Sequence, residues 1–285
     1  MTCLNPFISC TMANGSPCSM ASRKIKNMNM MNTSLSRRSF LAAGAAATAV
    51  AMIPSTLLAS PDKRRVVIWS EHTAPKDVYP NDINGAIAEG FKNLRNWEVV
   101  TASIDDPEQG CSEESLNKTD VVMWWGHKRH DEVKDENVAR VIKRVKEGGM
   151  GFIGLHSSHY CKPFKKLMGT ACSWGEYVVD GTSVKITVKD ANHPIARNVK
   201  DFELPKIERY GEPFAVPTPE SVVLNGTYTK PDGSKADARM GLCWTIGKGR
   251  VFYFTPGHET YDDFMRPEVQ RIMRNAVRWA GANAT

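Results

Sequence analysis

The chain has 285 residues, of which 41 % are hydrophobic and 24 % charged, a composition that excludes collagenous, coiled-coil and largely disordered proteins. Its 37 Lys and Arg exceed its 31 Asp and Glu by six, but five of these excess charges lie in residues 1–59, which contain no acidic residue. Residues 60–285 therefore carry a net charge of only +1 (32 basic minus 31 acidic), which argues against a nucleic-acid partner.

Residues 1–59 are interpreted as a leader that does not belong to the fold. Arg37 and Arg38 precede a charge-free, Ala-rich stretch from Phe40 to Ala59. Paired arginines before a weakly apolar segment are typical of a twin-arginine export signal. We therefore expect the twin-arginine export machinery as a partner, cleavage near Ala59 and a periplasmic location in a bacterium. An uncleaved membrane anchor is the alternative, because the stretch is about as long as a spanning helix.

Residues 60–285 predict one domain that begins with alternating strands and helices. Its strands are short apolar runs rich in β-branched residues, as strands buried on both faces require. Asp135 is the expected N-cap of the second helix. The alternation predicts an α/β fold with a flavodoxin-like, doubly wound and mostly parallel sheet. In chain order, the expected strands and helices contain residues 66–69, 83–94, 98–102, 121–125, 138–145 and 151–155.

The C-terminal half predicts antiparallel additions to this sheet. Residues 174–189 alternate between apolar and polar positions, and Asn225-Gly226 is a hairpin-turn signal. A last strand is expected at residues 250–254. It is followed by a C-terminal helix whose apolar positions run from Val269 to Ala280.

Six of the seven histidines lie within a few positions of a predicted strand end. Ligands bind beyond the carboxyl ends of parallel strands, so these side chains are expected to share one site. Imidazole and carboxylate groups are the usual ligands of divalent transition metals. His156, Glu212 and His258 are the candidate metal ligands, with zinc as the expected ion, and an acid/base site without metal is the alternative. The six histidines are His72, His127, His130, His156, His159 and His258.

The remaining catalytic roles fall to residues at the same edge of the sheet. His127 or His159 is expected to move a proton, and Glu71 to orient the group that moves it. A serine hydrolase would need Ser157 or Ser158 as its nucleophile, but the chain has no GxSxG turn.

A sugar would need aromatic and polar contacts at this edge. Trp125 and Tyr210 are the candidate stacking residues, and His130 and Glu259 the candidate polar contacts. No nucleotide cofactor is expected, because residues 69–74, after the first strand, contain no Gly that would admit a pyrophosphate.

Several short segments resemble the trehalose-utilisation (ThuA-like) family, over about residues 64–281. The resemblance implies a fold similar to class I glutamine amidotransferases. Those enzymes carry a nucleophilic Cys after the strand equivalent to residues 151–155, where this chain has His156, so amidotransfer is not expected. The segments are Trp124-Trp125-Gly126-His127, His130-Asp131-Glu132-Val133, Leu155-His156-Ser157-Ser158-His159, Lys165-Lys166-Leu167-Met168-Gly169-Thr170, Tyr210-Gly211-Glu212 and Pro256-Gly257-His258-Glu259-Thr260.

The function that this resemblance implies is catabolism of trehalose-type disaccharides or of their 3-keto derivatives. The expected reaction is isomerisation, or eliminative or hydrolytic cleavage, of a small sugar substrate. A 3-keto glycoside can lose its aglycone when a base removes the proton at C2 and an acid or cation stabilises the carbonyl oxygen. A non-catalytic carbohydrate-binding accessory protein is the alternative, and a homo-oligomer is compatible with the sequence.

Overall fold

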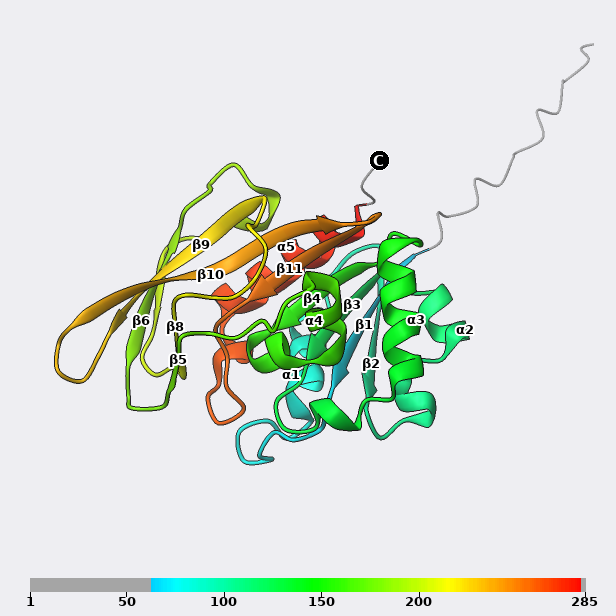
Figure 1. Ribbon diagram of the computed structural model, residues 1–285, viewed down its shortest axis with the longest axis horizontal. Helices are drawn as coiled ribbons and strands as arrows, with labels where there is room; N and C mark the ends of the chain where they lie inside the picture. Colours follow the sequence, from blue (N-terminus) through cyan, green and yellow to red (C-terminus); the bar gives the residue numbers. More distant parts are fainter. Residues whose placement is uncertain (1–62, 283–285) are drawn as a thin grey trace, which may run out of the picture. The chain divides into compact units, whose positions relative to one another are not determined.

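A nine-stranded sheet organises residues 63–282, which are the residues that the computed structural model describes (Figure 1). The predicted leader lies outside these residues. Five strands in the order β2-β1-β3-β4-β11 are all parallel, which is the 2-1-3-4-5 order of a doubly wound sheet. The predicted fold class is confirmed. These strands are β1 (Arg64–Ser70), β2 (Trp97–Ser103), β3 (Val121–Trp125), β4 (Gly151–Leu155) and β11 (Gly249–Phe254).

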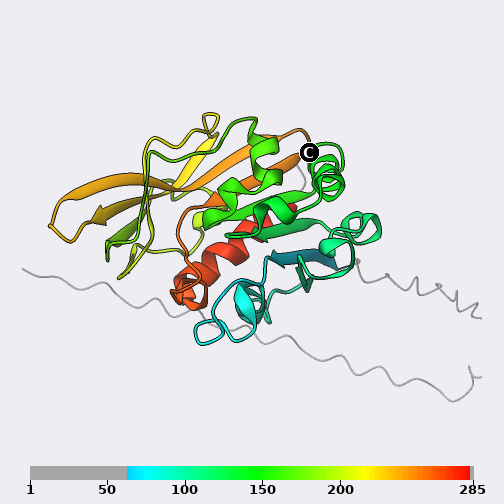
Figure 2. The same cartoon turned by 60° about the horizontal axis from the view of Figure 1, so that its bottom comes forward.

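Helices cover both faces of the parallel strands (Figure 2). Helices α1 (Asp82–Gly90) and α5 (Pro267–Gly281) contribute to the core on one face. Helices α2 (Glu113–Asn117), α3 (Asp135–Lys146) and α4 (Lys162–Met168) contribute to the core on the other. Each helix buries apolar side chains against the sheet, so the sheet is enclosed between two hydrophobic layers.

Trp124 and Trp125 show how alternation along a strand fills both layers. Trp124 packs in the core that contains α3, and Trp125 packs in the core that contains α1 and α5. The two rings therefore lie on opposite faces of the sheet. The prediction that Asp135 caps α3 is wrong: Lys134, with extended backbone, is the N-cap residue, and Asp135 lies in the first turn. A carboxylate there still interacts favourably with the helix dipole.

Antiparallel strands extend the sheet beyond β11, as predicted for the C-terminal half. A separate two-stranded ribbon pairs β5 (Glu176–Val178) with β8 (Arg209–Gly211). Short 3₁₀ turns occupy Pro107–Gly110, His130–Glu132, His156–Tyr160, Pro194–Ala196 and Asp263–Met265. The added strands of the main sheet are β10 (Lys235–Ile246), β9 (Ser221–Thr229), β6 (Ser183–Val188) and β7 (Phe202–Leu204).

The Asn225-Gly226 hairpin prediction is wrong, because both residues lie inside β9 and pair with β10. Gly226 is required there for another reason: a Cβ atom at this position would overlap the Met240 side chain. The turn between β9 and β10 is instead closed by a hydrogen bond of 2.9 Å from the Lys230 N–H to the carbonyl oxygen of Ser234.

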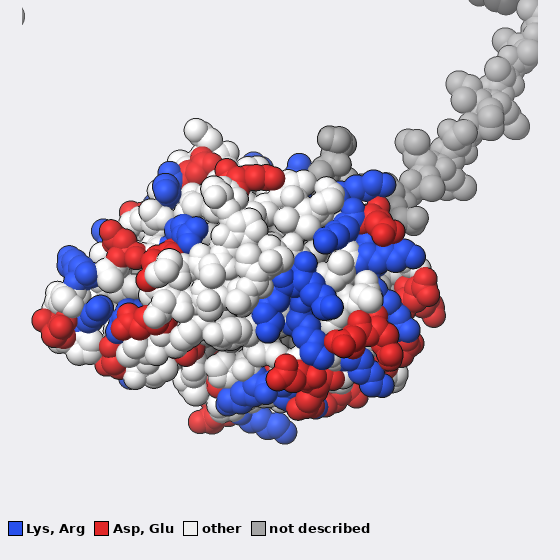
Figure 3. All heavy atoms as spheres, viewed as in Figure 1, with Lys and Arg blue, Asp and Glu red and all other residues white. Residues whose placement is uncertain are grey.

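The surface of the domain carries mixed charge. On the face shown in Figure 3, Lys and Arg side chains are interspersed with Asp and Glu, as the near-neutral net charge of residues 60–285 suggests. Among residues 63–282, none of the helices has the length and apolar character that a membrane span requires.

Asp263, in the turn before α5, is a buried carboxyl with a raised pKa. Its side chain is almost fully buried, and Oδ2 has no hydrogen-bond partner among the described residues. Burial raises the pKa of this carboxyl to about 7, although Arg266 acts to lower it. Because the carboxyl of an unfolded chain titrates near pH ~4, folding favours the protonated form. The resulting gain in the free energy of unfolding is complete below pH ~4 and is lost as the pH rises towards 7.

We therefore predict that Asp263→Asn stabilises the protein at pH 8, by an amount on the order of 2–4 kcal/mol, and has little effect at pH 4. Thermal unfolding followed by circular dichroism at both pH values measures the difference. An equal change in melting temperature at pH 4 and pH 8 would contradict the role of ionisation.

Candidate functional site

Four neighbouring parallel strands bring the site together at their carboxyl ends. Glu71 follows β1, His127 follows β3 after Gly126, and His156 follows β4 directly. His258 and Glu259 lie in the loop after β11. Because β1, β3, β4 and β11 are adjacent in the sheet, residues that are far apart in sequence meet at one edge.

Glu71 fixes the loop after β3. Its buried Oε2 accepts hydrogen bonds from the backbone N–H groups of His127, Lys128 and Arg129, at 2.7, 2.7 and 2.8 Å. Burial alone would raise the pKa of Glu71, but His130 and the backbone donors hold it below its usual range. A Cβ atom at Gly126 would lie only 2.7 Å from Glu71 Oε1, so this close approach requires Gly. Glu71 therefore orients His127 through its backbone and does not contact its imidazole.

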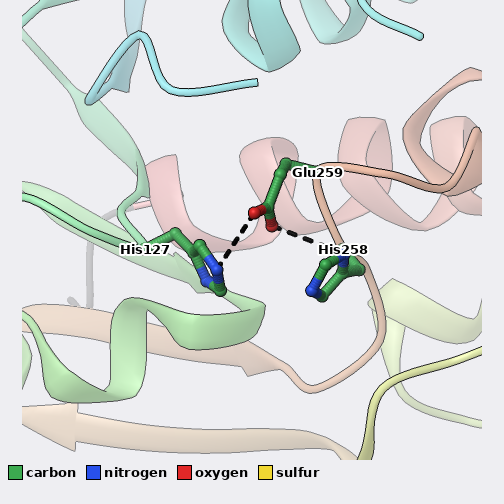
Figure 4. Close-up of side chains that lie close together, drawn as sticks. All are labelled: His127, His258 and Glu259. Carbon is green, nitrogen blue, oxygen red and sulfur yellow. Dashed lines mark ion pairs between the residues drawn. The ribbon is translucent and has the colours of Figure 1, made fainter. Parts of the chain in front are cut away.

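Glu259 lies between two histidines (Figure 4). His127 Nε2 is 3.1 Å from Glu259 Oε1, and His258 Nδ1 is 3.4 Å from Glu259 Oε2. Lys128 Nζ is 2.9 Å from Oε1, while the buried Oε2 has no hydrogen-bond partner among the described residues. His127, His258 and Glu259 form a possible metal-binding group, because one ligand atom from each lies within 4.8 Å of the other two.

The charges of this group suit a ligand role. Although burial would raise the pKa of Glu259, His127 and Lys128 hold it well below its usual range. Burial and the nearby His156 lower the pKa of His258 to about 4. Near neutral pH the group therefore offers an ionised carboxylate and, at His258, an uncharged imidazole.

His156 forms a second group with Glu208 and Tyr210. Its backbone φ is 48°, in the left-handed region, and its Nδ1–H donates to the carbonyl oxygen of Thr255 at 2.9 Å. Nε2 is 2.9 Å from Glu208 Oε2, and Tyr210 Oη is 3.1 Å from both atoms. Burial would raise the pKa of Glu208, but the hydrogen bond to His156 lowers it to about 2. The short contact between His156 Nε2 and Glu208 Oε2 is a path along which a proton can pass between imidazole and carboxylate.

The two groups are connected through His258. His258 Nε2 lies 3.8 Å from Glu208 Oε2, and the side chains of His258, Glu208 and His127 are 12, 14 and 18 % exposed. We call the connected set the contact chain. Three of its five members thus reach the protein surface. The contact chain consists of His127, Glu259, His258, Glu208 and His156.

Glu212, a predicted metal ligand, is not brought to His156 and His258. Its carboxylate accepts hydrogen bonds from Arg239 at 2.8 and 2.9 Å and from the N–H of Phe214 at 2.7 Å. Arg239 belongs to β10, which the sequence did not predict. The carboxylate that contacts His156 is that of Glu208, directly before β8. Alternation along an extended segment could have placed it on the same face as Tyr210, two positions later.

His159 and His130 have supporting positions. His159 is fully buried, its Nδ1–H donates to the carbonyl oxygen of His156 at 3.1 Å, and burial lowers its pKa to about 3. It is therefore poorly placed for the predicted proton transfer with a substrate. His130 Nδ1 lies 3.1 Å from Glu71 Oε1. His130 therefore supports Glu71 and is not a member of the contact chain.

The two predicted stacking residues are buried. Trp125 is fully buried, with its ring centroid 6.0 Å from that of His127. Tyr210 is 2 % exposed and stacks on His156 at a centroid distance of 4.6 Å. Both rings support imidazoles from inside the protein, and neither presents a free face to a sugar.

Comparisons with known proteins agree with this architecture. A family model described as ThuA, trehalose utilisation, matches residues 65–280. No curated protein matches the chain. A protein described as ThuA-like from Bacteroides uniformis is 18 % identical over 76 % of this chain and 91 % of its own, with a TM-score of 0.52. Another from Parabacteroides merdae is 15 % identical over 77 % and 90 %, with a TM-score of 0.55. A glutamine amidotransferase from Thermotoga maritima is less similar, with 11 % identity over 77 % and 99 % and a TM-score of 0.46.

Removing the Glu71 carboxylate is expected to destabilise the loop after β3. Glu71→Ala leaves three backbone N–H groups without their acceptor, which should cost about 2–5 kcal/mol and lower the melting temperature by roughly 5–15 °C. Glu98→Ala is the matched control, because Glu98 is half exposed and makes only a 3.8 Å contact with Arg65. Differential scanning calorimetry compares the two variants, and equal melting temperatures would contradict the role given to Glu71.

Proposed function

Because the chain belongs to the ThuA trehalose-utilisation family, we propose that it is an enzyme of sugar catabolism that acts on keto derivatives of trehalose-type disaccharides. The proposed reaction is isomerisation or cleavage that begins with loss of the proton next to the keto group. The observation that supports it best is the contact chain, which joins three histidines and two glutamates at one end of the sheet.

The His156–Glu208 pair has the geometry for proton transfer. In a 3-keto sugar the carbonyl acidifies the proton at C2, and a carboxylate close to this carbon can remove it. Glu208 is the accessible partner, while the buried His156 and Tyr210 hold its Oε2 through contacts of 2.9 and 3.1 Å. The electrons of the C2–H bond form a C2–C3 double bond as the carbonyl oxygen gains charge. When the C3 carbonyl re-forms, these electrons form a C1–C2 double bond and the bond from C1 to the aglycone oxygen breaks. The same pair returns the proton to that oxygen.

A divalent metal, with Zn²⁺ as the first choice, is proposed at His127, His258 and Glu259. The residues fit such an ion because the buried Oε2 of Glu259 lacks a hydrogen-bond partner and the set combines imidazole with carboxylate. A bound divalent cation would polarise the carbonyl oxygen of the sugar. Of the ligands predicted from sequence, this proposal keeps His258 and replaces His156 and Glu212.

The place of action is also a proposal. The paired Arg37 and Arg38 with the apolar stretch after them support export through the twin-arginine machinery to the periplasm. Fractionation of cells that express the full chain with both arginines changed to lysine tests this, since the variant should stay in the cytoplasm. Whether the chain forms a homo-oligomer can be measured on the exported protein by sedimentation.

We predict that Glu208→Gln lowers kcat on 3-keto-trehalose by about 10²- to 10⁴-fold, because an amide cannot accept the C2 proton. Glu212→Gln is the matched control: its carboxylate faces Arg239, so kcat should change by less than about threefold. Product formation is followed by chromatography. Wild-type turnover by Glu208→Gln would contradict the proposal. Stabilisation of the wild type by the sugar without any product would favour the carbohydrate-binding alternative.

We predict about one equivalent of divalent metal in the purified wild-type protein. His258→Ala should lose most of this metal, whereas His193→Ala should retain it, because His193 packs against Trp279 and is not in the contact chain. Elemental analysis by mass spectrometry measures the metal content. A wild-type protein without stoichiometric metal, or equal metal content in both variants, would overturn the assignment.

A further inference from the structure

The β5–β8 ribbon carries an exposed aromatic side chain. Tyr177 is 39 % exposed, and among residues 63–282 it is one of the few exposed large hydrophobic side chains. Val179, two positions further along the chain, is 58 % exposed. Their exposure leaves both side chains free to contact a molecule from solution.

The register of the ribbon places Tyr177 beside the contact chain. Tyr177 pairs directly with Tyr210, and residues opposite each other in an antiparallel pair project from the same face. Their ring centroids are 5.3 Å apart. Since Tyr210 Oη lies 3.1 Å from both His156 Nε2 and Glu208 Oε2, a single ring separates Tyr177 from the proton-transfer pair.

The Tyr177 ring is held in place by its neighbours. It stacks with the Tyr160 ring at a centroid distance of 5.7 Å and an angle of 25°, and the two hydroxyl oxygens are 2.7 Å apart. Tyr177 Oη also accepts a hydrogen bond from the N–H of Trp174 at 2.8 Å. The two tyrosines therefore present a fixed aromatic surface, so little conformational freedom is lost when a ligand binds.

A buried cation anchors the ribbon itself. Arg209, only 4 % exposed, forms ion pairs with Glu176 and, at 3.1 Å, with Asp180. Glu176 and Asp180 flank Tyr177 in sequence, while Arg209 precedes Tyr210. These pairs fix the position of Tyr177 relative to Tyr210.

From these contacts we infer that Tyr177, supported by Tyr160, forms a second sugar subsite on which the aglycone ring of the substrate stacks. This inference rests on the proposed function and deepens it. The C–H faces of a pyranose are apolar, and a tyrosine offers them a ring face with a polar tip. Trp125 and Tyr210 cannot do so because they are buried. The substrate class is then a disaccharide or a larger glycoside, and not a free keto-monosaccharide.

Steady-state kinetics with two substrates test the subsite. Tyr177→Ala should raise KM for 3-keto-trehalose about 3- to 10-fold, with kcat nearly unchanged, and should leave both parameters unchanged for the methyl 3-keto-glucoside, which has no second ring. Tyr177→Phe should keep most of the affinity. Met265→Ala is the control, as another exposed hydrophobic side chain outside the ribbon. Equal effects of Tyr177→Ala on both substrates, or no effect on either, would overturn the subsite.

A binding measurement separates this inference from the proposed reaction. Calorimetry with trehalose and with glucose, neither of which carries a keto group, requires no turnover. The wild type should bind trehalose more tightly than glucose, and Tyr177→Ala should lose that preference while remaining folded, as circular dichroism would show. If the wild type shows no preference, the subsite is refuted. If the preference is present but neither keto substrate reacts, the reaction is refuted and the subsite stands.

Discussion

The interaction on which the site depends is the buried carboxylate of Glu71 with three successive backbone N–H groups after β3. A loop that leaves a buried parallel strand must satisfy its amide groups, and a single carboxylate does so for His127, Lys128 and Arg129. Burying this charge would be unfavourable without the hydrogen-bond donors that surround it. This arrangement fixes the backbone from which the His127 side chain reaches Glu259.

Much of the parallel half could be predicted because its signals are local. Residues 121–125 form an apolar run between Asp120 and Gly126, and residues 151–155 form another that ends at His156. Both strands have these bounds in the structure. The convergence of His127, His156 and His258 then followed from the rule for the carboxyl ends of parallel strands. Glu208 could not be distinguished from Glu212 in the same way. Arg239, which belongs to β10, holds the Glu212 carboxylate. Contacts between segments so far apart in the chain leave no local pattern in the sequence.

Burial separates the histidines that sequence position alone had grouped together. His159 and His130 lie near strand ends, as predicted, but they hold the carbonyl of His156 and the carboxylate of Glu71. The same distinction applies to Trp125 and Tyr210, whose rings support imidazoles from within. Residue type and proximity to a strand end indicate the site, whereas depth in the fold determines which member reaches a ligand.

The left-handed backbone of His156 has a mechanical consequence. A non-glycine residue in this region costs about 1–2 kcal/mol, so the surrounding structure must hold it. Here Tyr253 Oη donates to the His156 carbonyl oxygen at 2.7 Å, and the Thr255 carbonyl oxygen accepts from its imidazole. Both partners belong to β11 or its end, and the loop that follows carries His258. Strand β11 thus supports His156 through hydrogen bonds and carries His258 in the loop that follows it. A displacement of β11 would therefore shift both histidines that contact Glu208.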